Sequence, residues 1–239
     1  MKFMRAEDVK SDLAKVASDE YARALARFFQ TGPGGYGEGD IFIGVRVPDN
    51  RKVCRAYKSL PLAEVQKLLK SRVHEHRLAA VIILNEQFRR ADPAGRMEIY
   101  SLYMAALRQG YINNWDIVDT SAGHIVGEYL RDTDRSELVR LAQSEKLWER
   151  RVAIIATSAY IGTADGSTTL ELAKLLLNDG HDLIHKAVGW MLREVGKRVD
   201  EVLLTGFLDE YAAEMPRTML RYACERLSPA QRAHYYKLT

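Results

Sequence analysis

The chain has 239 residues, 47% of them hydrophobic and 28% charged, a balance that is typical of a folded protein with a buried core and excludes disorder over most of its length. The formal net charge of +3 is mildly basic, so it neither establishes nor excludes nucleic acid as a partner. No apolar run approaches the roughly 20 residues of a membrane span. The first residues lack the apolar core of a secretory signal, and Cys54 and Cys224 alone make no disulfide framework. We therefore expect a cytoplasmic protein.

Apolar residues recur at spacings of three and four along almost the whole chain, the pattern of amphipathic helices. In chain order it predicts helices over 6–17, 19–30, 49–58, 61–70, 73–90, 93–110, 114–131, 134–143, 145–160, 167–178, 182–198, 199–213, 216–227 and 229–237. Ser167 and Asp182 are expected N-caps, and Gly180 is expected to end the helix before it. The apolar segment 41–45 is expected to be a buried connector rather than a strand.

The short connections predict that neighbouring helices form antiparallel hairpins. From residue 73 onward they pair as 73–110, 114–143, 145–178, 182–213 and 216–237, units near the length of HEAT-type repeats. No strict self-similarity accompanies this rhythm. The expected fold is all-α: a curved stack of antiparallel helix pairs, a HEAT-like or ARM-type α-superhelix, in one domain over 1–239. Four-helix-type packing is the second candidate.

Two patterns that resemble ligand sites have simpler interpretations. The glycine-rich segment 32–39 contains a G-x-G-x-x-G spacing, but no strand precedes it, so a surface loop is favoured over a dinucleotide site. A loop whose backbone amides approach phosphate groups is the alternative interpretation of this segment. His181 and His185 share a helix face without an evident third ligand, so no metal site and no cofactor are predicted. The segment 74–76 is interpreted as a solvated turn of charge.

The helix expected over 182–198 carries two stripes on opposite faces. Ile184, Val188, Met191 and Val195 form the apolar one, and Lys186, Trp190, Arg193 and Lys197 form a basic one that includes a tryptophan. Positive charge beside an aromatic ring is typical of nucleic-acid surfaces. The alternative is a solvated face whose tryptophan packs on a neighbouring helix.

Two further segments combine tryptophan with charge. Trp115 and Asp119 are four residues apart and hence adjacent on a helix surface, with a first-turn acid and a core tryptophan as the alternative interpretation. Arg150 and Arg151 lie near a helix start, where the helix dipole favours acids instead. These arginines are therefore expected to contact an external anion or Asp119.

Three motifs together, WDIVD (115–119), LWERRVAI (147–154) and KAVGWMLRE (186–194), resemble the AlkD-type DNA alkylation repair glycosylases in order and interval. The resemblance covers about residues 40–227. It implies a concave stack of HEAT-like helix pairs, Asp119 as the catalytic carboxylate, Trp115 and Trp190 as aromatic walls beside the lesion, and Arg151 as a phosphate contact. Where family members often carry a second aromatic residue, this chain has Asn114.

The resemblance implies hydrolysis of the N-glycosidic bond of cationic N-alkylated purines, such as 3-methyladenine and 7-methylguanine, in double-stranded DNA. It implies a bacterial-type monomer that associates with the nucleoid when it acts on DNA. The predicted DNA-binding residues are Arg150, Arg151, Lys186, Arg193 and Lys197. A non-catalytic DNA-binding paralogue and a protein-interaction scaffold are the alternatives.

Overall fold

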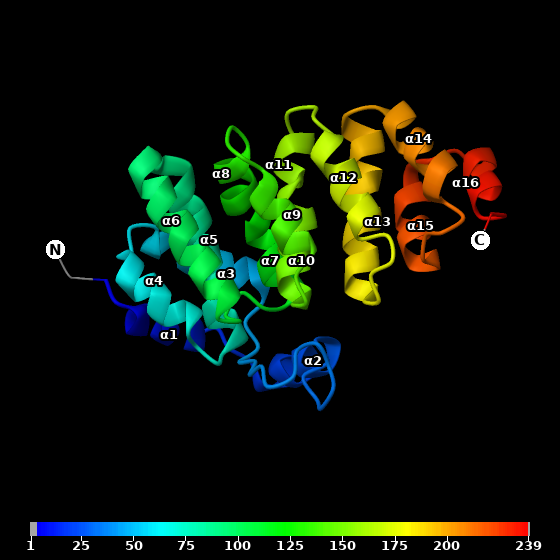
Figure 1. Cartoon of the computed structure of the whole chain (residues 1–239). Helices are drawn as coiled ribbons and strands as arrows, with labels where there is room; N and C mark the ends of the chain where they lie inside the picture. The colour runs from blue at the N-terminus through cyan, green and yellow to red at the C-terminus, as the bar shows by residue number, and fades with distance from the viewer. Residues whose placement is uncertain (1–3, 239) are drawn as a thin grey trace. The chain divides into compact units, whose positions relative to one another are not determined.

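The computed structural model describes residues 4–238, and in this range the regular structure is helical apart from one isolated bridge between Ile41 and Val73. The all-α prediction is therefore confirmed. The chain divides into two compact units, Met1–Ile125 and Val126–Thr239, and each is described by itself (Figure 1). Among the described helices, none combines the length and the apolar character needed to cross a membrane.

The first unit contains seven α-helices and one short 3₁₀ turn in its described part. They are α1 (Ala6–Ala14), α2 (Asp19–Phe28), α3 (Val47–Cys54), η1 (Arg55–Tyr57), α4 (Leu62–Leu69), α5 (His74–Arg90), α6 (Pro93–Arg108) and α7 (Trp115–Ala122). The long helix α5 is central, because α3, α4 and α7 all pack against it. Helix α2 contributes no buried residue and lies apart from the other helices of this unit (Figure 1).

The second unit is built around α13. Its described helices are α8 (Glu128–Leu130), α9 (Ser136–Ala142), α10 (Leu147–Ala156), α11 (Ser158–Ile161), α12 (Ser167–Leu175), α13 (Asp182–Arg198), α14 (Glu201–Tyr211), α15 (Arg217–Ala223), η3 (Cys224–Arg226) and α16 (Pro229–Tyr235). Helix α13 packs against α10, α14 and α15. Gly189 permits the contact with α15, because a Cβ there would lie 2.4 Å from the carbonyl oxygen of Met219.

The predicted helices 49–58 and 216–227 each end in a 3₁₀ turn, and two others are interrupted within their length. The predicted helix 114–131 contains a π-helical turn, η2 (Gly123–Gly127), and the boundary between the two units falls inside it. The predicted helix 145–160 is divided at Thr157, whose hydroxyl donates to the carbonyl of Ile154 at 2.7 Å. Such local side-chain bonds to the backbone compete with regular helix geometry. Periodicity alone does not register either interruption.

The helix starts also correct two predictions. The N-cap of α13 is His181 rather than Asp182, and its ring nitrogen accepts from the amide of Leu183 at 3.1 Å. Ser167 is the first residue of α12 and not its cap; its amide donates to Asp165 at 3.0 Å. Helix α12 ends at Leu175, so Gly180 lies several residues beyond the end that it was expected to make.

The segment between α2 and α3 is irregular, as predicted. Residues 32–39 form a loop, and Phe42, Gly44 and Val45 are buried in the connector that follows. Gly44 has φ +79° and lies against the carbonyl of Ser18, a position that a side chain would fill. Asp40, which precedes the connector, contacts Asn113 and Asn114 directly before α7.

Candidate active site

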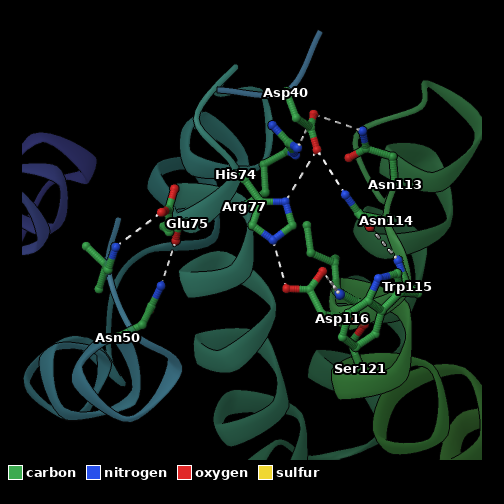
Figure 2. Close-up of polar contacts among 12 residues, drawn as sticks. Asp40, Asn50, His74, Glu75, Arg77, Asn113, Asn114, Trp115, Asp116 and Ser121 are labelled. Atoms are coloured by element: carbon green, nitrogen blue, oxygen red, sulfur yellow. Dashed lines mark hydrogen bonds and ion pairs between the residues drawn. The ribbon is translucent and has the colours of Figure 1, made fainter. Parts of the chain in front are cut away.

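The start of α7 is fixed by a buried asparagine. Asn114 is fully buried and has φ 76°, in the left-handed region. Its side-chain oxygen accepts from the amide of Trp115 at 3.0 Å, and its side-chain nitrogen donates to Asp40 at 3.3 Å (Figure 2). Left-handed backbone in a non-glycine residue is costly unless the surroundings enforce it. Asn114 thus holds Trp115 at the first position of the helix.

Trp115 extends an aromatic stack that begins in the core. Its ring lies parallel to that of Phe29, with centroids 5.3 Å apart and 13° between the planes, and Phe29 stacks in turn on Phe42 at 4.9 Å. Phe28 meets the Trp115 ring edge-on at 6.1 Å and is 63% exposed. Trp115 itself is half-buried. One part of its ring is therefore supported by the core while another part stays accessible.

Asp119 lies one helical turn after Trp115 and is also half-buried. The core behind α7 holds the fully buried Tyr103, whose hydroxyl pairs with that of Ser121 at 2.9 Å. Burial, and to a smaller degree the charge of Asp119, raises the pKa of Tyr103. The π-helical turn η2 begins four residues later, and such turns are frequent at functional sites. The structure thus places Trp115 and Asp119 together on one rigid helix.

A cluster of four buried charged side chains adjoins the first turn of α7. His74 lies between Asp40 and Asp116, with Nδ1 3.3 Å from one carboxylate and Nε2 2.8 Å from the other. Arg77 donates to the second oxygen of Asp40 at 2.6 Å (Figure 2). Burial lowers the pKa of His74, but the charge of Asp116 and hydrogen bonds to both carboxylates outweigh it and raise the pKa to about 8.

This cluster corrects the interpretation of residues 74–76 as a solvated turn. His74, Glu75 and His76 are 1%, 1% and 8% exposed. The Glu75 carboxylate accepts from the backbone amides of Ile43, Gly44 and Val45 at 2.8–3.2 Å, which ties the connector to α5. The sequence carried one signal of this burial: four titratable residues, 74–77, stand directly before the apolar run that forms the core of α5. The partners of His74, Asp40 and Asp116, are too distant from it along the chain to be inferred from the sequence.

In the second unit, Arg150 and Arg151 connect α10 to the start of α13. Arg150 forms an ion pair with Asp179 at 2.6 Å and donates to the carbonyls of Ser144 and Glu145 at 2.9 Å each. Arg151 is only 4% exposed and donates to the carbonyl of Leu183. Both guanidinium groups thus make hydrogen bonds within the protein. Their contacts with DNA stay predictions.

Helix α13 confirms the apolar stripe, since Ile184, Val188, Met191 and Val195 are all at most 1% exposed. On the other face, Trp190 is half-buried and Lys197 is exposed.

Carboxylates accompany two cations of this basic stripe. Lys186 pairs with Asp182 at 2.6 Å, and Arg193 pairs with Glu194 at 3.0 Å and also with Glu225. These neighbours reduce the net positive charge that the stripe presents. Trp115 and Asp119 belong to the first unit, whereas Trp190 and the predicted DNA-binding residues belong to the second, so their union in one site is a prediction.

No metal centre emerges within the described residues, where no group of three or more His, Cys, Asp or Glu side chains could hold a metal ion. His181 instead caps α13, and His185 contacts the carbonyl of Asp179.

Comparison with known proteins decides the family. A family model described as DNA alkylation repair enzyme matches residues 9–227. The chain belongs to this family. The resemblance expected from the three motifs is therefore confirmed, and in this DNA alkylation repair family member the matched region extends over most of each unit.

Among solved structures, this family member is similar to a predicted DNA alkylation repair enzyme from Enterococcus faecalis, with a TM-score of 0.68 and 15% sequence identity. The similarity covers 89% of this chain and 97% of the other, which shows a shared fold. No curated protein sequence matches the chain.

Proposed function

We propose that the protein is a DNA glycosylase that hydrolyses the N-glycosidic bond of cationic N-alkylated purines, such as 3-methyladenine and 7-methylguanine, in duplex DNA. The observation that carries the proposal is the pairing of Asp119 with Trp115 on α7, half-exposed side chains on a firmly anchored helix. Membership of a DNA alkylation repair family makes an alkylated duplex the first substrate to consider.

The chemistry requires little beyond charge stabilisation. Alkylation at a ring nitrogen gives the purine a positive charge, so the base accepts the electron pair of the breaking N-glycosidic bond and leaves neutral without a general acid. Positive charge then develops on the deoxyribose, as in other glycoside hydrolysis through oxocarbenium-like states. Asp119 stabilises that charge and orients the water that attacks C1′, and the water's proton passes to the carboxylate or to solvent. Such a preorganised group is worth about 10²–10³-fold in rate.

The aromatic and basic residues have separate tasks in this proposal. Trp115 and Trp190 hold the cationic nucleotide through cation–π contacts, each worth about 0.5–2 kcal/mol. The predicted DNA-binding residues in α10 and α13 hold the phosphates that flank this nucleotide. Selectivity then comes from the charge and lability of the lesion rather than from an enclosing base pocket.

The test is release of free base from methylated duplex DNA by the purified protein in single-turnover conditions. The proposal expects 7-methylguanine and 3-methyladenine to appear, with undamaged guanine and adenine retained. Absence of any released purine, with the protein shown to be folded, would reject it.

The pairing of Lys186 and Arg193 with carboxylates favours one alternative, a scaffold that binds another protein. Failure to bind duplex DNA even at low salt would support that scaffold, because a phosphate-binding surface binds most strongly there.

A further inference from the structure

His74 has a geometry that favours the doubly protonated ring. Both ring nitrogens lie within hydrogen-bond distance of a carboxylate oxygen, Asp40 at 3.3 Å and Asp116 at 2.8 Å. An ionised carboxylate only accepts hydrogen bonds, so each nitrogen must donate, and only the imidazolium form donates from both. A neutral ring would turn a lone pair toward one of the two carboxylates. The side chains are 2%, 6% and 13% exposed, so water offers little relief.

The other groups around His74 balance this charge. On α5, Arg77 pairs with Asp40, while the Glu75 carboxylate points away to the amides of the connector. Phe42 and Phe29 flank the imidazole, with ring centroids at 4.5 and 5.1 Å. With His74 protonated, two cations meet two anions. Without the proton, a negative charge remains uncompensated in a buried site, which is strongly unfavourable.

The same cluster holds the segment that leads into α7. Asp40 accepts from the side chains of Asn113 at 3.2 Å and Asn114 at 3.3 Å, and Asp116 accepts from the amide of Ile117 at 2.9 Å. Asp40 therefore binds Asn114 before Trp115, and His74 binds Asp116 after it (Figure 2).

We propose that protonated His74 is a positioning residue, which bridges Asp40 and Asp116 to fix the first turn of α7 and, through it, Trp115 and Asp119. The inference rests on the proposed glycosylase function for its effect on catalysis, but not for its effect on the helix. Because the bridge requires the proton, it is released as the pH rises past the pKa of about 8.

The first experiment needs no activity. Imidazole nitrogen NMR of the full chain reports whether both nitrogens of His74 are protonated at pH 7. In a Trp148→Phe/Trp190→Phe background, Trp115 is the single tryptophan, and its fluorescence reports the start of α7 across the pH range. We expect a doubly protonated ring and a fluorescence transition with the same midpoint. A neutral ring at pH 7, or no coincident transition, would overturn the inference.

The second experiment uses three variants of the whole protein. Displacement of a catalytic group costs about 10–100-fold, so His74→Gln is expected to slow excision by that factor and to flatten its dependence on alkaline pH. Asp116→Asn removes the charge that sustains the proton and should shift the midpoint below its wild-type position. His76→Gln is the matched control on the same helix, because His76 bonds to Ser71 and not to α7.

The outcomes separate the inference from the proposed function. The positioning role would be refuted if His74→Gln excised purines at the wild-type rate, or if His76→Gln lost as much activity as His74→Gln. It would also be refuted if the midpoint of the pH transition were unchanged in Asp116→Asn. If no variant and no wild-type protein releases a purine, the glycosylase proposal fails, and the NMR and fluorescence results alone decide whether His74 holds α7. If His74→Gln does not fold, Asp116→Asn still tests the shift.

Discussion

Asp119 is half-buried on a helix that two anchors secure, the Asn114 cap and the His74 bridge, which meet at Asp40. A carboxylate in such a place loses little freedom when a positive charge develops beside it, which is the condition for electrostatic catalysis. The alternative of a first-turn acid does not apply, because α7 begins at Trp115 and its first-turn acid is Asp116.

We expect Asp119→Asn to lower the single-turnover rate of 7-methylguanine excision by about two orders of magnitude or more. Duplex affinity should stay level or rise, since the variant no longer carries a charge that repels phosphate. Asp132→Asn, at a side chain that is 85% exposed, is the control for removal of one negative charge. Near-normal excision by this variant would contradict the catalytic role, whatever the effect on the free energy of unfolding.

His74 and His76 give the protein opposite pH dependences. The pKa of His74 is raised to about 8, so its stabilisation is complete below the unfolded value of about 6.5 and is lost as the pH rises through 8. Burial lowers the pKa of His76 from its usual value of about 6.5 to about 4. Between these two pH values the unfolded chain binds a proton that the folded protein does not. Stability there falls as the pH falls.

The free energy of unfolding should therefore be greatest near neutral pH. From His74 alone we expect a loss of about 2 kcal/mol above pH 8. Urea unfolding across the pH range measures this directly. His74→Gln should remove the alkaline decline, and His76→Gln should weaken the acid one. A stability curve that rises steadily from neutral to alkaline pH would be incompatible with a protonated His74.

Among the helices, α13 shows what sequence periodicity could and could not predict. Its bounds and buried stripe followed from the spacing of Ile184, Val188 and Met191, because periodicity is local and burial follows it. The Glu225 carboxylate beside Arg193 was not predicted, since it is 32 residues away and reaches Arg193 through the packing of α15 and η3 on α13. The cluster around His74 escaped for the same reason: Asp40 and Asp116 are 34 and 42 residues distant.

The basic face of α13 should contribute to duplex binding despite these carboxylates, because Lys197 is exposed and the side chain of Lys186 is 41% exposed. We expect Lys186→Ala with Lys197→Ala to reduce the log–log salt slope of binding by roughly 0.9 for each phosphate that the variant no longer neutralises. Lys52→Ala with Lys58→Ala removes two exposed lysines from the first unit and serves as the charge-matched control. Equal slopes for the two double variants would place the DNA footprint elsewhere.

The chain as a whole divides into two compact units, yet the boundary lies within a π-helical turn between two helices and not in a linker. The family match also spans the boundary. We therefore retain the prediction of a single cooperative domain over 1–239.

Tryptophan positions allow this to be tested. Trp115 reports the first unit in a Trp148→Phe/Trp190→Phe variant, and the other two tryptophans report the second unit in Trp115→Phe. Urea transitions of the two proteins should coincide with each other and with the loss of helical circular dichroism, as two-state unfolding requires. Separate midpoints would show that the units unfold independently.

The buried asparagine at the start of α7 also has a consequence for how this protein can diverge. At φ 76° and with no exposed surface, position 114 admits few residues besides asparagine and glycine, and only asparagine both caps Trp115 and donates to Asp40. Loss of Asp40 would in turn leave His74, Arg77 and two asparagines without their common acceptor. These positions are therefore expected to change together or not at all, and an aligned set of relatives should show them as one covarying group.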